Sequence, residues 1–400
     1  MKLSYRYRFY PTEAQARHLA RTFGCCRYVY NWALETWTTA YRERGENLSE
    51  SDLSRGLPAL KRRPETTWLA DVSSITLQQS VRNFGRAQRA FLEKRSGYPS
   101  FKRRSSRQSA SYTLRAFRYS VEDGVPALQL AKMDEPLRVR WSRPLPAEPS
   151  SLTIVRDRAG RYFVSLICEA PRREAPQAER AAVGVDLGLT HFAILSTGEK
   201  VENPRHMEQD LKALHRAQKS LSRKQKGSAN REKARRRVAK IHARIRDRRA
   251  DFLHKLSTRL IRENQAVCVE SLNVEAMVKN RRLARHIGQA GWGEFVRLLD
   301  YKAELYGREV VRCGRFEPTS KRCSGCGHVC ESLDLGTRRW RCAECGEDHD
   351  RDVNAAKNIL AAGLAVSASG DGVSPRVPLA PPVAVCEGGT SQGGETNASM

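Results

Sequence analysis

The chain has 400 residues, and 71 lysine and arginine residues against 44 acidic ones give it a formal net charge of +27. This length exceeds one ordinary hydrophobic core and favours two to four folding units. A surface this basic favours a polyanionic partner, usually nucleic acid, with an anionic membrane as the alternative. No stretch approaches the roughly 20 apolar residues that span a bilayer, which argues against a membrane-spanning helix.

The start of the chain, residues 1–8, alternates charged and aromatic side chains and has no apolar signal-peptide segment. We therefore expect a protein that stays in the cytoplasm where it is made. Its eleven cysteines would be reduced there. Cysteines with paired spacing are then expected to bind metal rather than to form disulfides.

The first hundred residues predict one strand followed by helices. Residues 3–10 alternate as a strand does, and Thr12 with Gln15 forms a capping box for a helix expected to stop near Gly24. A second helical stretch follows. A third, from about residue 74 to 94, carries apolar side chains at steps of three and four, which predicts a core-facing helix surface.

The period of the apolar pattern changes to two between residues 111 and 171, which predicts strands. A turn at residues 157–160 is expected to complete a hairpin. Residues 1–175 are therefore interpreted as a β-barrel or sheet with a helical insertion. We assign the N-terminal β-barrel to residues 1–11 and 109–175, the helical recognition insertion to residues 12–108, and a linker to residues 172–180.

A helical period returns after Pro204, in two apolar seams that predict antiparallel helices joined at Gly227. Residues 212–249 contain 16 lysines and arginines against two acids. A charged helix face is usually only solvated, but such a face mixes signs and this one does not, which favours nucleic-acid contact. The basic loop at residues 101–107 fits a solvated loop equally well. The candidate nucleic-acid-binding residues are Arg27, Tyr28, Tyr30, Asn31, Lys102, Arg103, Arg104, Arg223, Lys224, Arg235, Arg236 and Arg237.

Two carboxylates interrupt otherwise apolar strands. Asp186 follows Val183-Gly184-Val185, and Glu270 follows Ala266-Val267-Cys268-Val269. Both precede loop residues, so both are expected at the carboxyl edge of a sheet. A third acid, Asp350 or Asp352, stands at a helix start. Taken singly, each acid has an ordinary explanation as a helix cap or as an acid at a strand end. Together the three acids predict a Mg²⁺ site, because unpaired buried carboxylates are costly and Mg²⁺ prefers oxygen ligands.

Two Cys-x-x-Cys-Gly motifs, separated by 15 residues, predict one tetrahedral metal site. Two intervening residues let both thiolates of a motif reach one ion, and the glycine permits the tight turn around sulfur. Four thiolates make a closed structural zinc site, so the ligands are expected to be Cys323, Cys326, Cys342 and Cys345. The cysteines without partner spacing are Cys25, Cys26, Cys168, Cys268, Cys313, Cys330 and Cys386.

The order Val183-Gly184-Val185-Asp186-Leu187-Gly188, then Val269-Glu270-Ser271-Leu272, then Asp350-Arg351-Asp352-Val353-Asn354 resembles the split RuvC-like (RNase H fold) nuclease of the TnpB (OrfB) family. That family is encoded by insertion sequences and is regarded as ancestral to type V CRISPR effectors. The likeness covers nearly the whole chain. Further matching segments are residues 10–15, 26–31, 97–101, 291–295 and 318–323.

The resemblance implies an RNA-guided DNA endonuclease of a multidomain α/β class. Asp186, Glu270 and Asp352 would be catalytic and bind two Mg²⁺ ions; the family match, not spacing, selects Asp352 over Asp350. The implied partners are a guide RNA, a target DNA with a short motif beside the target sequence and, as a further candidate, a separate transposase encoded by the same element. The resemblance also implies a prokaryotic protein that associates with the nucleoid. The nuclease domain would occupy residues 181–320 and 347–364, and the zinc ribbon would occupy residues 321–346. Residues 365–400 form a tail whose composition predicts disorder.

Three alternatives remain open at this point. A non-catalytic nucleic-acid-binding regulator would be expected to lack one of the acids, and none is lost. A guide-independent RuvC-type nuclease would be expected to be compact, without a basic N-terminal half or a zinc ribbon. A transposase that performs strand transfer would share the carboxylates. Tyr28, Tyr30 and Trp292 could stack on nucleic acid, although Trp292 fits a packed core equally well.

Overall fold

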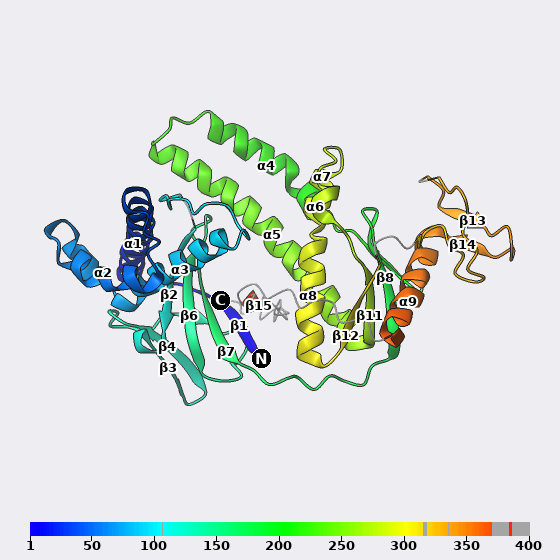
Figure 1. Ribbon diagram of the computed structural model, residues 1–400, viewed down its shortest axis with the longest axis horizontal. Helices are drawn as coiled ribbons and strands as arrows, with labels where there is room; N and C mark the ends of the chain where they lie inside the picture. Colours follow the sequence, from blue (N-terminus) through cyan, green and yellow to red (C-terminus); the bar gives the residue numbers. More distant parts are fainter. Residues whose placement is uncertain (106, 315–317, 335, 370–383, 386–400) are drawn as a thin grey trace, which may run out of the picture. The chain divides into compact units, whose positions relative to one another are not determined.

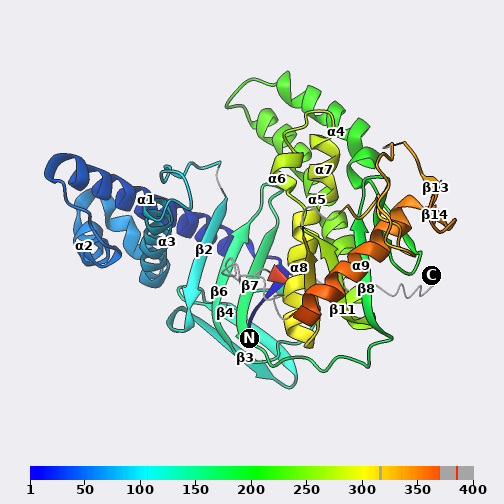
Figure 2. The same cartoon turned by 45° about the vertical axis from the view of Figure 1, so that its right-hand side comes forward.

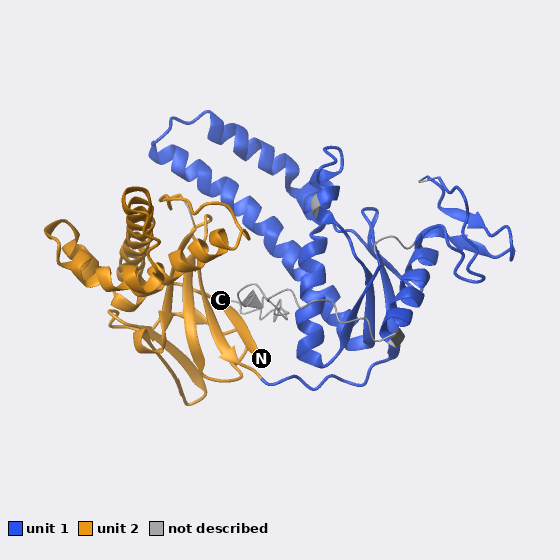
Figure 3. Ribbon diagram, in the orientation of Figure 1, with its two compact units in different colours: residues 1, 171–380, 386–400 blue, residues 2–170, 381–385 orange. Residues whose placement is uncertain are grey.

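A computed structural model describes residues 1–105, 107–314, 318–334, 336–369 and 384–385. The chain forms two compact units that divide between Ala170 and Pro171, shown in two colours in Figure 3. Within the described residues, no helix is both long and apolar enough to cross a membrane.

The N-terminal unit contains a helical subdomain built on one long helix. This helix, α1 (Glu13–Arg44), starts at the expected capping box, in which the Gln15 N–H donates to Thr12 Oγ1 and the Thr12 N–H donates to Gln15 Oε1. The expected stop near Gly24 is wrong, because α1 continues to Gly45, whose φ of 69° ends it. Buried side chains on both sides of Gly24 offset the roughly 1 kcal/mol that a mid-helix glycine costs.

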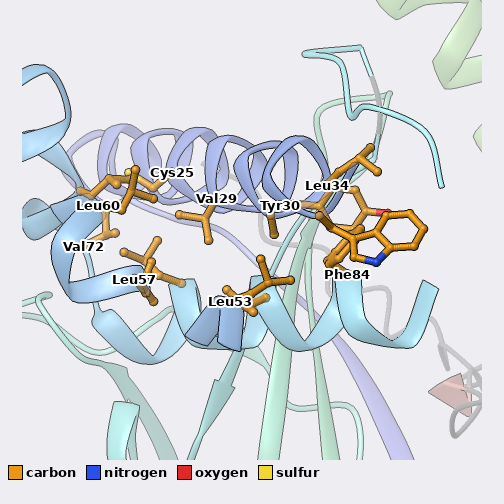
Figure 4. Packing of buried hydrophobic residues seen from close by; sticks show 14 residues of the cluster. Cys25, Val29, Tyr30, Leu34, Leu53, Leu57, Leu60, Val72 and Phe84 are labelled. Carbon is orange, nitrogen blue, oxygen red and sulfur yellow. The ribbon is translucent and has the colours of Figure 1, made fainter. Parts of the chain in front are cut away.

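Helices α2 (Glu50–Arg62) and α3 (Ser74–Leu92), with the 3₁₀ helix η1 (Pro64–Asp71), pack on α1. Figure 4 shows their shared core, in which Tyr30 and Trp37 lie edge-on or tilted against Phe84. The helix predicted at residues 74–94 is therefore confirmed. The insertion is a packed subdomain with its own hydrophobic core.

The main sheet of this unit has the strand order β15-β1-β7-β6-β2, and β5 also pairs with β1. The expected hairpin across residues 157–160 is confirmed as β6–β7. In the described part of the chain the sheet stays open, because no pairing joins β2 to the other edge; the expected closed barrel is therefore not observed. The strands are β1 (Lys2–Phe9), β2 (Gln108–Thr113), β5 (Val139–Arg140), β6 (Pro149–Arg156), β7 (Tyr162–Glu169) and β15 (Ala384–Val385), and β3 (Phe117–Glu122) and β4 (Val125–Leu130) form a separate hairpin.

The C-terminal unit is built on a mixed sheet with the order β10-β9-β8-β11-β12. β8 pairs antiparallel with β9, and β9 with β10, whereas β8–β11 and β11–β12 are parallel. The near-continuous apolar runs of β8 and β11 follow from this position, because both strands lie inside the sheet. The strands are β8 (Arg180–Leu187), β9 (His191–Leu195), β10 (Lys200–Glu202), β11 (Asn264–Glu270) and β12 (Glu309–Cys313).

The expected helical hairpin extends from this sheet as α4 (His206–Ser222) and α5 (Ala229–Glu263), which lie side by side in Figures 1 and 2. Leu214 and Ala217 of α4 pack against Ile241 and Ile245 of α5. Asp210 is buried between the helices and pairs with two arginines of α5. α6 (Val274–Met277), α7 (Ala284–Ala290) and α8 (Trp292–Tyr306) connect β11 to β12.

The last helix, α9 (Arg351–Ser369), lies across the sheet and packs chiefly on β8, as Figure 2 shows. The expected disorder of residues 365–400 is wrong for residues 365–369, which continue this helix. Val366 packs with Ile359 on the sheet, and this burial stabilises the end of the helix. Of the remaining tail, residues 370–383 and 386–400, which include Cys386, lie outside the described residues.

Candidate functional site

Asp186 and Glu270 lie at the carboxyl ends of adjacent parallel strands. The register pairs Val185 of β8 with Val269 of β11, so the next position along each strand is one of the two acids. Side chains at matched positions of neighbouring strands point to the same face. The two carboxylates, 84 positions apart in the sequence, therefore share one edge and one face of the sheet.

The environment of Asp186 opposes its ionisation. Burial, followed by the negative charges of Glu270 and Asp352, raises the pKa of Asp186 to about 7, while the Leu187 N–H and Arg351 act in the opposite direction. Burial also raises the pKa of Glu270. The electrostatic coupling places Asp352 near Asp186, although it comes from a helix 166 positions later.

The two acids at the start of α9 have different roles in the fold. Asp350 caps the helix, because its Oδ1 accepts the N–H groups of Asp352 (3.2 Å) and Val353 (3.1 Å), while its Oδ2 lies 2.6 Å from Lys200 Nζ. These contacts lower the pKa of Asp350 despite some burial. Asp352 Oδ2 instead lies 3.6 Å from Arg338 Nη1. Of the two acids, Asp352 is the one whose charge raises the pKa of Asp186.

The three carboxylates form a donor set that suits a hard divalent cation. Among the described residues, their oxygens are not all within 4.8 Å of one another, as they would need to be to ligate one small ion jointly without movement. Burial and the two neighbouring carboxylates raise the pKa of Asp186, and a bound cation would offset both effects. The residues present therefore fit divalent metal in the chemistry of their donors.

The four motif cysteines come together in a small two-stranded module, β13 (Arg339–Arg341) and β14 (Asp348–Asp350). The ligand atoms of Cys323, Cys326, Cys342 and Cys345 all lie within 4.8 Å of one another. Gly327 and Gly346 have φ of 82° and 73°, as the expected turns after each motif require. This arrangement can hold one tetrahedral metal ion.

Within the cysteine cluster, the surroundings favour the thiolate of Cys342, whereas the neighbouring sulfurs raise the pKa of Cys326 and Cys345. The N–H groups of Cys345 and Glu344 lower the pKa of Cys342 to about 6. His349 lies 3.0 Å from Cys323 Sγ through Nε2, and its ring packs against Trp340 at 4.7 Å. An imidazole in this place can donate a hydrogen bond to a metal-bound sulfur. His349 also immediately precedes Asp350, the cap of α9.

Asn354 and Asn358 join the cysteine module to α9, and the sequence reading overlooked them. Asn354 Oδ1 accepts the Ser324 N–H (2.9 Å), and both side-chain amides donate to the Arg322 carbonyl at 2.7 Å. Both side chains are buried. Their spacing of four in the sequence is the signal that could have revealed one polar helix face. Asn354 follows Asp352 by two residues, so the module is fixed beside the carboxylates.

The basic candidates of the hairpin lie on its outer surface. Arg223 and Lys224, at the end of α4, are exposed, as are three consecutive arginines of α5, of which Arg235 pairs with Glu232 at 2.8 Å. The hairpin therefore presents a surface dominated by cations. The three consecutive arginines of α5 are Arg235, Arg236 and Arg237.

The N-terminal candidates have more varied environments. Asn31 exchanges hydrogen bonds with the backbone of Lys102, and the Lys102 ammonium lies 3.6 Å from the centre of the Tyr30 ring, which is 6% exposed. These three residues fix the loop to α1. Tyr28 is exposed and packs edge-on against Trp68 at 5.1 Å. Arg27 is half-buried, Arg103 and Arg104 are exposed, and Trp292 is buried.

The fold and the two clusters define a two-unit α/β protein with a carboxylate cluster at a sheet edge and a four-cysteine module beside it. Residues 165–281 match the family model OrfB_IS605, described as "Probable transposase"; residues 292–359 match the Cas12f1-like TNB domain, and residues 1–46 match the helix-turn-helix domain of OrfB_IS605. In the structure this last range contains β1 and the uninterrupted α1. The chain belongs to the OrfB (TnpB) family of insertion sequences.

Relatives span nearly the whole chain. A Streptomyces pristinaespiralis protein named "Putative RNA-guided DNA endonuclease" is 53% identical, over 94% of this chain and 93% of the relative. The InsQ protein of Escherichia coli, with the same description, is 31% identical over 94% and 96%.

Solved structures share the fold. A Cas12f1–sgRNA–target DNA complex aligns with a TM-score of 0.58 at 14% identity, covering 87% of this chain and 83% of that one. The mini-RNA-guided endonuclease CRISPR-Cas_phi3 aligns with a TM-score of 0.52 at 8% identity, covering 90% and 92%. The identities are low, so these two likenesses concern the fold.

Proposed function

We propose that this chain is an RNA-guided DNA endonuclease of a transposable element, which hydrolyses phosphodiester bonds with divalent metal ions. The observation that carries the proposal is that Asp186 and Glu270 end adjacent parallel strands, and that burial together with the charges of Glu270 and Asp352 raises the pKa of Asp186 to about 7. The relatives named as RNA-guided DNA endonucleases support the substrate and the guide. Strands β10, β9 and β8 are antiparallel neighbours, and β11 and β12 run parallel to β8; this order supports an RNase H-like (RuvC) assignment.

The three carboxylates would hold Mg²⁺, which prefers oxygen ligands. When bound, two such ions about 4 Å apart activate water and neutralise charge on the phosphate that is attacked. The chain itself positions the acids through β8, β11 and the capped start of α9. Hydrolysis joins a water oxygen to phosphorus and breaks the bond to the leaving sugar oxygen, which takes up a proton.

The other parts of the chain would bind nucleic acid and stabilise the nuclease. Zinc held by the four cysteines would fix the module that Asn354 and Asn358 attach to α9. The basic hairpin α4–α5 and the N-terminal unit would hold a guide RNA and its DNA partner through backbone contacts. A separate transposase of the same element would carry out mobility. The proposed domains are residues 1–175 for recognition, 181–320 and 347–364 for the nuclease, and 321–346 for the zinc ribbon.

The test is to purify the protein with its bound RNA, sequence that RNA, and measure cleavage of a matched plasmid with Mg²⁺. The wild type is expected to carry one defined RNA and to cut only matched DNA. Asp186→Ala should retain the RNA and lose cleavage, whereas Asp247→Ala, an exposed acid of α5, should retain both. A wild-type protein without a defined RNA, or one that cuts unmatched DNA equally well, would contradict the guided function.

A further inference from the structure

A cavity of about 270 Å³ lies at the base of the α4–α5 hairpin, within the C-terminal unit. Its walls come from the turn after β8, the start of α4, the middle of α5 and the end of α7. Leu189, in the wall, follows Asp186 by three residues. Three residues of chain span at most about 10 Å, so this part of the cavity wall lies close to Asp186.

The cavity has an aromatic side suited to a flat ring. Phe192 and Phe252, which both line it, pack edge to face with centroids 5.0 Å apart and planes at 89°. His206 packs against Phe252 at 6.3 Å. Leu283, 42% exposed, lies at the rim on the segment before α7. A nucleobase stacks well on such surfaces, whatever its identity.

Two buried polar atoms of the lining have no hydrogen-bond partner among the described residues: His206 Nε2 and Arg249 Nε. Buried polar groups are nearly always paired, so unpaired ones indicate a missing ligand or water. Burial, with the positive charges of Arg248 and Arg249, lowers the pKa of His206, which favours its neutral imidazole. A neutral imidazole can donate to or accept from a base edge.

The mouth of the cavity is cationic and is tied to the turn after Asp186. Arg205 is exposed and has a φ of 42°, a conformation that a non-glycine residue holds only when its surroundings impose it. Its N–H donates to Asn203 Oδ1 (3.3 Å), and the Asn203 amide donates to the Leu189 carbonyl (2.9 Å). The one acid of the lining, Glu208, lies 3.9 Å from His286.

We propose that this cavity binds one unstacked nucleotide of the single-stranded DNA that passes the carboxylate cluster. The base would lie against the side of the cavity formed by Phe192, Phe252 and His206, and the phosphate would lie against Arg205 and Arg249. The identity of the ligand rests on the function proposed above. An aromatic floor, a polar edge and a cationic mouth together match base, base edge and phosphate, and the volume suits one nucleotide rather than a duplex.

The test uses the full-length protein with its zinc retained, in buffer without added Mg²⁺ so that no cleavage occurs, and a single-stranded hexadeoxynucleotide carrying one 2-aminopurine. Stacking in the cavity is expected to quench its fluorescence saturably. His206→Ala should weaken this binding about tenfold, within the range that one stacked base contributes. Leu283→Trp should do the same by filling the mouth, and its exposed position makes a folding defect improbable as the cause. His215→Ala, an exposed histidine of the same helix, is the matched control and should bind like wild type.

The inference is overturned if both cavity variants bind like wild type, or if His215→Ala weakens binding equally. The readout requires neither a guide nor cleavage, so the two proposals can fail separately. Loss of quenching in the cavity variants, without any guided cleavage by wild type, would uphold the cavity and reject the guided function. Guided cleavage by the wild type, with unchanged binding in both cavity variants, would uphold the guided function and overturn the cavity proposal.

Discussion

Gly184 of β8 lies directly beneath the carbonyl oxygen of Ala356 in α9, with no room for a side chain between strand and helix. Gly184 precedes Asp186 by two residues and so shares its face of the sheet, while Asp352 precedes Ala356 by one helical turn. The close contact of these two backbones therefore fixes the distance between α9 and β8, the elements that carry Asp352 and Asp186. A second glycine of α9, Gly363, also lies close to the sheet: a Cβ at this position would be 2.7 Å from the Cβ of Cys268 in β11.

Gly184→Ala is expected to impair the site without removing any carboxylate. The added methyl would overlap the Ala356 carbonyl and approach Leu360 N within 2.8 Å, so α9 must shift. Overpacking of this kind costs roughly 1–3 kcal/mol in the free energy of unfolding. Cleavage should fall by more than RNA retention does. Gly293→Ala, with open space around its Cβ, is the control; equal cleavage by both variants would show that the distance between α9 and β8 does not matter.

Asn354→Ala is expected to loosen the cysteine module from α9. The substitution leaves the Ser324 N–H without its acceptor in a buried setting, which costs roughly 1–3 kcal/mol. Urea unfolding should show this loss, and cleavage should decrease while zinc content stays at one ion per chain under saturating metal. Lys357→Ala, exposed on the same helix, should behave like wild type. A stable, fully active Asn354→Ala protein would refute the connecting role.

Removal of zinc is expected to reduce DNA cleavage even when Mg²⁺ is abundant, because the module is held against the start of α9. Cys342→Ser should lower the zinc content measured by atomic emission, and Mg²⁺-dependent cleavage with it. Cys330→Ser changes a cysteine outside the four-sulfur cluster and should keep both. Full cleavage by a zinc-free protein would contradict this prediction, because it would show that the carboxylate cluster does not depend on the cysteine cluster.

Magnesium affinity is expected to depend on pH through Asp186. Its pKa of about 7 in the metal-free protein means that below this pH a proton must leave before the cation binds. Affinity should therefore fall up to about tenfold for each pH unit below 7 and level off above it. Calorimetric titration at pH 6, 7 and 8 measures this, with proton release in buffers of different ionisation enthalpy. A flat profile would contradict the coupling of the three acids.

The same shift affects stability without metal. The folded-state pKa of Asp186 lies above its unfolded value, so the folded chain holds the extra proton between about pH 4 and 7. The free energy of unfolding should therefore decrease as pH rises through this window. Asp186→Asn should remove that part of the pH dependence in the zinc-loaded protein without Mg²⁺, as chemical denaturation at several pH values would show.

Periodicity and lone acids predicted much of the C-terminal unit. The helical hairpin, strands β8 and β11, and the paired cysteines each leave a local signal in the sequence, namely a seam, an apolar run or a fixed spacing. The proximity of Asp186 and Asp352 leaves no local signal, since it depends on α9 crossing β8. Only the likeness to the family indicated it.

The errors in the N-terminal unit have physical reasons. Gly24 marks a possible helix end, but the buried side chains beside it decide that α1 continues. Helix α2 was not predicted, although Ser49 and Asp52 form a capping box at its start; the helix continues through Pro58, a residue type that usually interrupts helices. Closure of a sheet depends on which edges meet, and the alternation within single strands does not encode this.

The central claim is that Asp186, Glu270 and Asp352 share divalent ions. The most direct measurement is a structure of the protein with Mn²⁺ in place of Mg²⁺, in which anomalous scattering locates the ions. The account predicts two peaks about 4 Å apart, bounded by oxygens of these three carboxylates. Manganese bound elsewhere, or carboxylate oxygens more than about 10 Å from one another in the metal-loaded protein, would contradict it.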